Sequence, residues 1–227
     1  MALDIEYVRE RHPGRWIVLA IVIIILGLAG WYGYKWYTTG DLPFPLAIVS
    51  ADSRVDESTV TSNQVKTYTV SAAHPRYITI PSLNLGNTRV FPVGLDSNNV
   101  LQSPSNINDA GWYSKSSTPG SGGVILIDGH NMGTTKDGAF AKLGTLKKGD
   151  KIVLERGDGR TFTYSVVDNQ SMSIDEVNAT GMTLMGKTAV PGKEALNLMT
   201  FDGKWVPRLG MFDRRIMVRT VIDGNTN

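Results

Sequence analysis

The longest apolar run of the chain lies near its N-terminus. Residues 16–34 have the sequence WIVLAIVIIILGLAGWYGY, which contains no charged residue. As an α-helix this run is about 28 Å long at ~1.5 Å per residue, close to the ~30 Å hydrocarbon thickness of a bilayer. It is apolar on every face, which disfavours a surface helix of a soluble domain. The pattern predicts one transmembrane helix.

The flanks of this run predict its orientation. Trp16 stands at one end and several Trp and Tyr residues crowd the other, as in the aromatic belts of membrane helices. Arg9, Arg11 and Arg15 precede the run, whereas Lys35 alone follows closely, so the N-terminus is expected in the cytoplasm. A cleaved signal peptide is the alternative, but bulky aromatic residues occupy the place of its small cleavage-site residues.

The rest of the chain has the pattern of a β-rich domain. The predicted strands are Tyr77–Pro81, continued past the proline by Ser82–Leu85, then Arg89–Val93, Gly122–Ile127, Lys151–Glu155, Arg160–Val167, Ala195–Phe201 and Arg215–Ile222. The run from Gly122 to Ile127 is continuously apolar and predicts a buried central strand. The sequence between Glu155 and Arg160 is a hairpin signal.

Short helices are expected between these strands. Residues 139–146 predict a helical turn with Phe140, Leu143 and Leu146 on one face. Ser173 followed by Glu176 predicts a capped helix over 173–177. The chain is therefore divided as follows: 1–15 cytoplasmic segment, 16–37 transmembrane anchor, 38–73 extracytoplasmic linker, 74–223 barrel or sandwich domain, 224–227 tail.

Composition narrows the possible chemistry. The 24 Gly and 10 Pro favour many turns, and a formal charge of +2 is too balanced to predict a nucleic-acid partner. The sequence contains no Cys, which excludes disulfides, thiolate metal sites and thiol catalysis by these residues. Asp128 is interpreted as a surface or turn residue, and with His130 it is too sparse for a metal site. No cofactor is predicted.

Three positions stand out in their local sequences. His130 follows an apolar run ending in Asp-Gly, Phe201 follows Leu-Met-Thr, and Arg214 opens the run Arg-Arg-Ile-Met-Val. In order and context they resemble the His, Cys and Arg positions of sortases, the membrane-anchored cysteine transpeptidases of bacterial surfaces. Phe201 stands where that family has its nucleophilic Cys.

The resemblance extends from Tyr77 to Ile222. The matching motifs are Ile80–Leu85, Gly111–Tyr113 with Thr118–Gly122, Gly129–Asn131 with the following Phe140, Leu143, Leu146 and Gly149–Asp150, Leu198–Thr200 and Arg214–Val218. The segment before His130 is similar to that of class E and F sortases. The resemblance implies a mainly all-β, eight-stranded sortase barrel with short helices behind one transmembrane helix.

The resemblance also implies an activity and partners. Sortases cleave a sorting signal at Thr-Gly or a similar bond and transfer the acyl group to an amine. The implied partners are a sorting-signal peptide, an amine acceptor and, through the anchor, membrane lipid. The implied location is the plasma membrane, with a single span and the C-terminal domain outside the cell.

Chemistry assigns a role to each of the three positions. A thiolate must attack the peptide carbonyl, His130 would protonate the leaving amine, and Arg214 would stabilise the oxyanion. Phe201 has no nucleophilic atom. Arg215 would face the opposite side of the strand, and counting back from Val218 favours Arg214. His130 as a hydrogen-bonded structural histidine remains the alternative.

Candidate substrate contacts lie near Phe201. These are Thr200, Trp205 and Arg208, although Trp205 would serve equally well as a cover for the barrel rim. Three functions remain open. The chain is a sortase-family pseudoenzyme that binds a peptide, which is the preferred hypothesis, or an active sortase whose native residue 201 is Cys, or a membrane-tethered barrel without a peptide site.

Overall fold

The computed structural model describes residues 13–41, 55–97 and 100–226. The chain divides into two compact units, residues 1–47 with 206–210, and residues 48–205 with 211–227. The first unit contains helix α1 (Pro13–Thr39), whose large apolar side chains lie exposed rather than in a protein core. This helix is long and apolar enough to cross a membrane.

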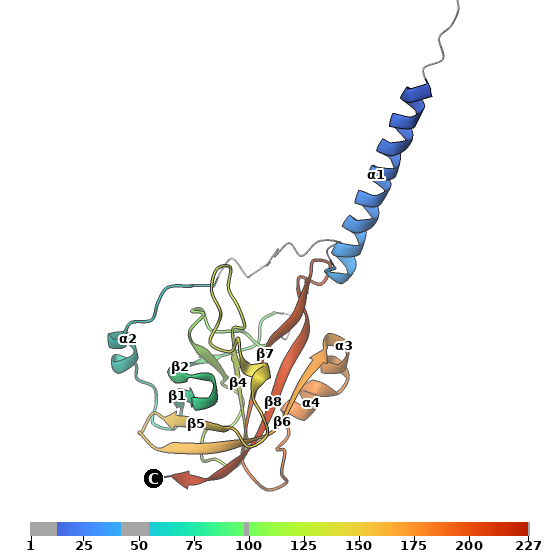
Figure 1. Ribbon diagram of the computed structural model, residues 1–227. Coiled ribbons are helices and arrows are strands. Elements are labelled where there is room, and N and C mark those ends of the chain that lie inside the picture. The colour runs from blue at the N-terminus through green and yellow to red at the C-terminus, as the bar shows by residue number, and fades with distance from the viewer. Residues whose placement is uncertain (1–12, 42–54, 98–99, 227) are drawn as a thin grey trace, which may run out of the picture. The chain divides into compact units, whose positions relative to one another are not determined.

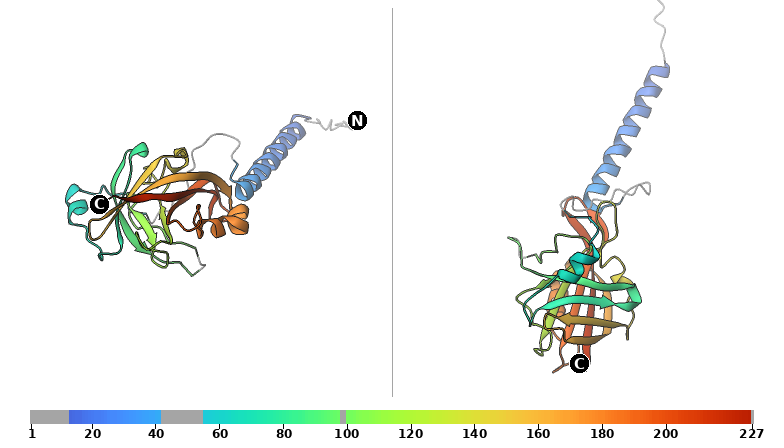
Figure 2. Two further views of the ribbon diagram at one scale, coloured as in Figure 1. Left: turned by 90° about the horizontal axis from the view of Figure 1, so that it is seen from below. Right: turned by 90° about the vertical axis from the view of Figure 1, so that its left-hand side faces the viewer.

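The second unit is a closed eight-stranded barrel (Figures 1 and 2). Its strands are β1 (Pro75–Ile80), β2 (Leu85–Val93), β3 (Ala110–Tyr113), β4 (Val124–Gly129), β5 (Lys151–Arg156), β6 (Thr161–Ser173), β7 (Ala195–Val206) and β8 (Met211–Thr226). They close in the order β1-β2-β3-β4-β7-β8-β6-β5. The prediction of an eight-stranded barrel with short helices is confirmed.

Strand β4 lies between β3 and β7 in the barrel. It pairs antiparallel with β3 and parallel with β7, in a register that runs from Val124 opposite Ala195 to Asp128 opposite Met199. Because β4 and β7 run the same way, residues that follow the paired stretch on each strand emerge at the same edge of the sheet. The ends of the two predicted motifs around His130 and Phe201 are thereby brought to one edge.

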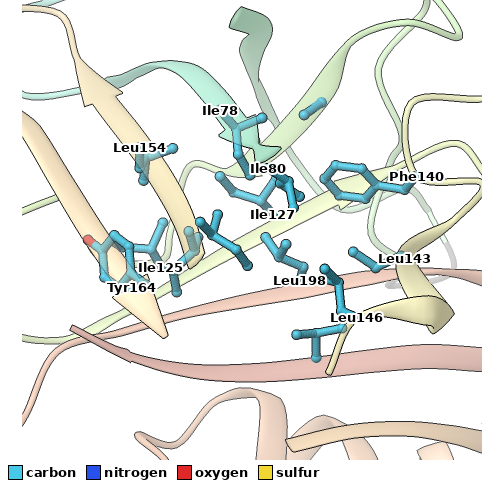
Figure 3. Close-up of a cluster of buried hydrophobic side chains, with 14 of the residues drawn as sticks. Ile78, Ile80, Ile125, Ile127, Phe140, Leu143, Leu146, Leu154, Tyr164 and Leu198 are labelled. Atoms are coloured by element: carbon cyan, nitrogen blue, oxygen red, sulfur yellow. The ribbon is translucent and has the colours of Figure 1, made fainter. Parts of the chain in front are cut away.

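The barrel interior is filled by alternate residues of these strands. Ile125 and Ile127 of β4, Leu198 of β7 and Val218 of β8 are fully buried in one apolar cluster. Figure 3 shows Ile125, Ile127 and Leu198 pointing into the same space as Phe140 and Tyr164. Phe140, Leu143 and Leu146, predicted to share one face of a helical turn over 139–146, are all buried, but only Leu143–Thr145 forms a helical turn, of the 3₁₀ type.

Two local features follow directly from their sequences. Helix α3 (Ile174–Glu176) begins at Ser173, whose side chain accepts a hydrogen bond from the Glu176 amide in a capping box, as predicted. The prediction that Ser82–Leu85 continues the first strand is wrong. Pro81 has no N–H for the sheet and begins a 3₁₀ turn that ends at Asn84, with φ of 55°, so the chain reverses into β2.

The segment predicted as a linker also contains structure in its described part. Helix α2 (Ser62–Thr67) has a capping box between Thr61 and Gln64. The Tyr68 hydroxyl donates to Val90 O of β2 at 2.5 Å, and Thr135 N donates to the Glu57 carboxylate at 3.1 Å. Residues 42–54 of the predicted linker lie outside the described residues. The C-terminal part of the linker therefore packs on the barrel.

Leu198→Ala tests the inner face of β7. Leu198 is fully buried in the core cluster, so its truncation should lower the free energy of unfolding by about 2–5 kcal/mol. The same change at Leu184 of helix α4 (Met182–Met185), which is 36% exposed, is the matched control and should have a much smaller effect. Thermal unfolding of the detergent-solubilised chain, followed by circular dichroism, measures both. Equal shifts for the two variants would contradict this assignment of the core.

Candidate active site and peptide-binding face

On β4, β7 and β8, every second residue points into the barrel core. The residues that alternate with them form a second face, which points away from the barrel interior. Strand alternation places these residues together. We call this set the outer face, and it consists of Leu126, Asp128, Asn197, Met199, Phe201, Arg215, Met217 and Arg219. Leu126, Met199 and Met217 share a buried apolar cluster that is separate from the barrel core.

A helical segment, residues 174–188, covers part of the outer face. Val177 and Met185 of this segment belong to the same apolar cluster. The Asn197 side chain donates from Nδ2 to Met185 O at 2.8 Å, and Arg219 donates from Nη2 to Thr188 O at 3.2 Å. Polar side chains of β7 and β8 thus fix the backbone of the segment, while its apolar side chains contact the methionines beneath.

Phe201 lies on the outer face against Arg215. Strands β7 and β8 are neighbours in the barrel, and the Thr220 hydroxyl of β8 donates to Leu196 O of β7 at 2.6 Å. Further along the two strands, Phe201 contacts Arg215. The guanidinium carbon of Arg215 lies 4.1 Å from the centroid of the Phe201 ring. This is a close cation–π contact.

The structure brings Arg215, and not Arg214, to Phe201. Arg215 is 7% exposed and donates from Nη1 to Phe212 O at 3.0 Å and to Arg214 O at 2.8 Å. Burial lowers the pKa of Arg215 to about 10, with Asp128 opposing this effect, so it remains a cation at neutral pH. Arg214 is directed elsewhere and donates from Nε to Ser171 Oγ at 2.8 Å.

Asp128 is the acidic member of the outer face. The interpretation of Asp128 as a surface or turn residue is wrong, because its side chain is 3% exposed. The Ser103 hydroxyl donates to Asp128 Oδ2 at 2.5 Å. Burial raises the pKa of Asp128 to about 7, while the Ser103 hydrogen bond and the charge of Arg215 act in the opposite direction. Near neutral pH the carboxyl group is therefore poised between its two protonation states.

His130 follows β4 at the edge shared with Phe201. The register of β4 and β7 places each two residues beyond the pair Asp128 and Met199. The His130 ring is buried, and its Nε2 lies 2.6 Å from Pro104 O. Because a carbonyl oxygen only accepts, Nε2 carries the proton in this contact. The backbone oxygen of His130 accepts from Phe140 N at 2.9 Å, which fixes the chain after the strand.

The three predicted substrate contacts are placed differently from one another. Thr200 is 2% exposed, and its hydroxyl donates to Gly129 O at 2.7 Å, so it ties β7 to β4. Trp205 is partly buried and packs edge-to-face on Phe212, with ring centroids 5.6 Å apart. Arg208 belongs to the other unit of the chain, where its amide donates to Tyr37 O at 3.1 Å.

Cavities open on the barrel unit. One, of about 560 Å³, lies beside the outer face and is lined by Val124 and Leu126 of β4 and by Met182 and Met185 of α4, among others. Another, of about 480 Å³, is lined by the turn between β1 and β2 and by Asp137 and Lys142, among others. None of the predicted site residues lines either of these cavities. Within the described residues, no group of three or more His, Cys, Asp or Glu side chains is placed to hold a metal ion.

Comparison with known proteins agrees with this architecture. The sortase domain family model matches residues 78–222, and the chain therefore belongs to the sortase family. No curated protein sequence matches it.

Solved structures of similar fold are also sortases. Sortase C-1 from Actinomyces oris is 23% identical, with 68% of this chain and 76% of that chain covered and a TM-score of 0.49. Sortase A from Corynebacterium diphtheriae, a lid mutant, is 20% identical, with 65% and 68% covered and a TM-score of 0.48. Listeria monocytogenes sortase A is 20% identical, with 69% and 92% covered and a TM-score of 0.49.

Asp128→Asn tests the buried carboxyl group. Its pKa is about 7 in the folded protein, against 3.8 for an unshifted side chain. Between these values the folded protein binds a proton that the unfolded chain has released, so the free energy of unfolding falls as the pH rises. At ~1.4 kcal/mol per pKa unit, the free energy of unfolding falls by up to about 4 kcal/mol. The Asp128→Asn variant should not show this fall, because its amide does not titrate.

The measurement is chemical denaturation of the parent and the variant at about pH 5 and about pH 8. The advantage of Asp128→Asn over the parent should grow with pH. Asp137→Asn removes an exposed carboxylate and is the matched control. Parallel pH profiles for the parent and Asp128→Asn would show that the carboxyl group is not desolvated as the structure indicates.

Proposed function

We propose that this chain is a membrane-anchored pseudoenzyme of the sortase family, which binds a peptide on its outer face and does not carry out transpeptidation. The observation that carries the proposal is the contact between Phe201 and Arg215. An aromatic ring stands at the position expected for the nucleophile, in direct contact with the cation of Arg215. The sequence favours Arg214 for the oxyanion role, and we transfer that role to Arg215 in this proposal. The ring occupies the space that a reacting carbonyl would need.

The missing nucleophile limits the chemistry more than any other feature. Acyl transfer through a covalent intermediate requires a thiolate or an equivalent nucleophile. For comparison, loss of the nucleophile in a serine protease lowers kcat by about 10⁶. His130 still supplies a ring proton and Arg215 still supplies a positive charge, but neither group forms the acyl intermediate.

Peptide binding is supported by a cavity beside the outer face, at the end of β4 that pairs with Ala195 and away from Phe201. The cavity of about 560 Å³ along β4 adjoins the apolar cluster of Leu126 and Met185. Methionine side chains adapt to ligands of irregular shape. A sorting-signal peptide is the partner class that the family membership favours. We also propose that the chain resembles the class E and F sortases. An amine acceptor is a further partner in this proposal.

The proposed location follows from α1. The helix is long and apolar enough to span a bilayer, and the arginines before it favour a cytoplasmic N-terminus. The barrel unit would then lie outside the plasma membrane. Proteolysis of intact cells tests this topology, because only an extracytoplasmic barrel is accessible to added protease.

The second candidate function is that of an active sortase whose native residue 201 is Cys. The retention of both His130 and Arg215 around position 201 favours it. In this case the ring of Phe201 is the only element that prevents catalysis. Determination of codon 201 in the native gene distinguishes the two candidates.

Phe201→Cys is the decisive variant. We expect no transpeptidation by the parent and measurable turnover by Phe201→Cys, at least about 10³-fold above the parent, because the thiolate restores the nucleophile. Phe201→Ala removes the ring without adding a thiol and should remain inactive. The assay uses the full chain in detergent, a panel of Leu-Pro-x-Thr-Gly-like peptides and an amine acceptor.

Each outcome of this assay has a distinct meaning. Turnover by the parent would reject the pseudoenzyme. Saturable peptide binding without turnover by any variant would leave binding as the function and show that the site has changed beyond position 201. Absence of both binding and turnover in all three proteins would leave a tethered barrel without a peptide site.

A further inference from the structure

The outer face already carries a short segment of the chain itself. This segment, Leu101–Pro104, belongs to the connection between β2 and β3. A bridge between Leu95 and Leu101 and a hydrogen bond from Gln102 N to Gly94 O, 3.0 Å long, fix its beginning. Ser105 O, which follows it, accepts from Asp56 N at 2.9 Å. Both ends of the segment are therefore fixed.

Each contact of this segment engages a different chemical group of the site. Leu101 is buried in the apolar cluster that contains Leu126 and Met199. Ser103 donates its hydroxyl proton to Asp128 at 2.5 Å. Pro104 offers its backbone oxygen to the Nε2 proton of His130 at 2.6 Å. The segment thus provides an apolar side chain, a hydroxyl group and a peptide carbonyl in sequence.

The segment is defined by its contacts. Leu101 and Pro104 are buried and Ser103 is partly buried, whereas Gln102 and the following Ser105 are exposed. The residues that engage the cluster, Asp128 and His130 are therefore the ones withdrawn from solvent.

We propose that residues 101–104 are an internal ligand of the outer face, and that an external peptide binds there only by displacing them. This inference rests on the peptide-binding function proposed above. It also specifies the partner: a peptide with an apolar residue followed two positions later by Ser or Thr. The carbonyl of the next residue then lies at His130.

An internal ligand lowers the apparent affinity for an external one. The observed dissociation constant equals the intrinsic constant divided by the fraction of molecules in which the face is open. Weakening the internal contacts raises that fraction. Leu101→Ala with Ser103→Ala removes the apolar and the hydroxyl contact together, and should tighten external peptide binding by at least about tenfold.

The experiment measures binding of a fluorescent peptide with the sequence of residues 100–105, Val-Leu-Gln-Ser-Pro-Ser, blocked at both ends. The full chain is used in detergent micelles, with circular dichroism to confirm that each variant is folded. The control pair is Gln102→Ala with Ser105→Ala, whose side chains are exposed in the same segment. It should bind the peptide as weakly as the parent.

Hydrogen exchange provides a second readout that does not depend on the variants. A saturating sorting-signal peptide that binds the parent should increase exchange at residues 101–104 while it protects β7. If such a peptide binds the parent and the double variant equally, with no change in exchange at 101–104, the internal-ligand proposal is overturned and the proposed function stands.

The remaining outcomes separate the two proposals further. Binding of the 100–105 peptide to the double variant, without binding of any sorting-signal peptide to any variant, would support the internal ligand and reject the sorting-signal partner. Failure of a folded double variant to bind the 100–105 peptide would reject the internal ligand, whatever the result with sorting signals.

Discussion

The alternation of residues on β4, β7 and β8 is the constraint on which the site depends. One set of alternate residues fills the barrel core, and the other set forms the outer face with its methionines, Asp128 and Arg215. A slip of one residue in β8 would bring a charged residue into the core, either Arg219 in place of Val218 or Arg215 in place of Ile216. The cost of burying such a charge fixes the register, and the register decides which arginine meets Phe201.

The register places Phe201 against a buried cation. Arg215 is buried, and its Nη1 donates to two backbone oxygens, so its charge is offset only in part, by the carboxylates of Asp128 and Asp213. The face of the Phe201 ring adds a favourable electrostatic contact at 4.1 Å. The aromatic ring therefore stabilises the buried arginine. Phe201 fits its surroundings and does not disrupt them.

Local sequence signals predicted the elements that depend on few residues. The apolar run of β4, the hairpin between β5 and β6 and the capped start of α3 at Ser173 needed no knowledge of distant partners. The prediction of eight strands in a closed barrel came from the family resemblance, and the order of the strands came from the structure, because pairing between β4 and β7 joins segments about 70 residues apart. The turn at Pro81 was missed because the apolar pattern continues through it.

The site was predicted less completely for the same reason. Position 201 was predicted because its neighbours form a recognisable motif, but which of Arg214 and Arg215 lies against Phe201 depends on how β8 packs beside β7. Burial of Asp128 could not be inferred from its own strand, since the covering residues 101–104 lie in a different connection. Thr200 was expected to contact substrate, yet its place on the inner side of β7 uses its hydroxyl for Gly129.

The contacts of residues 101–104 also explain how the outer face persists without an external ligand. A buried carboxyl group and a buried imidazole are costly unless each has a hydrogen-bond partner. Ser103 and Pro104 provide one partner for each, and Leu101 covers the apolar cluster beside them. A peptide that replaces the segment must satisfy the same three groups, because any group left unpaired would oppose the exchange. The chemistry of the internal segment is therefore the best guide to the chemistry of the partner.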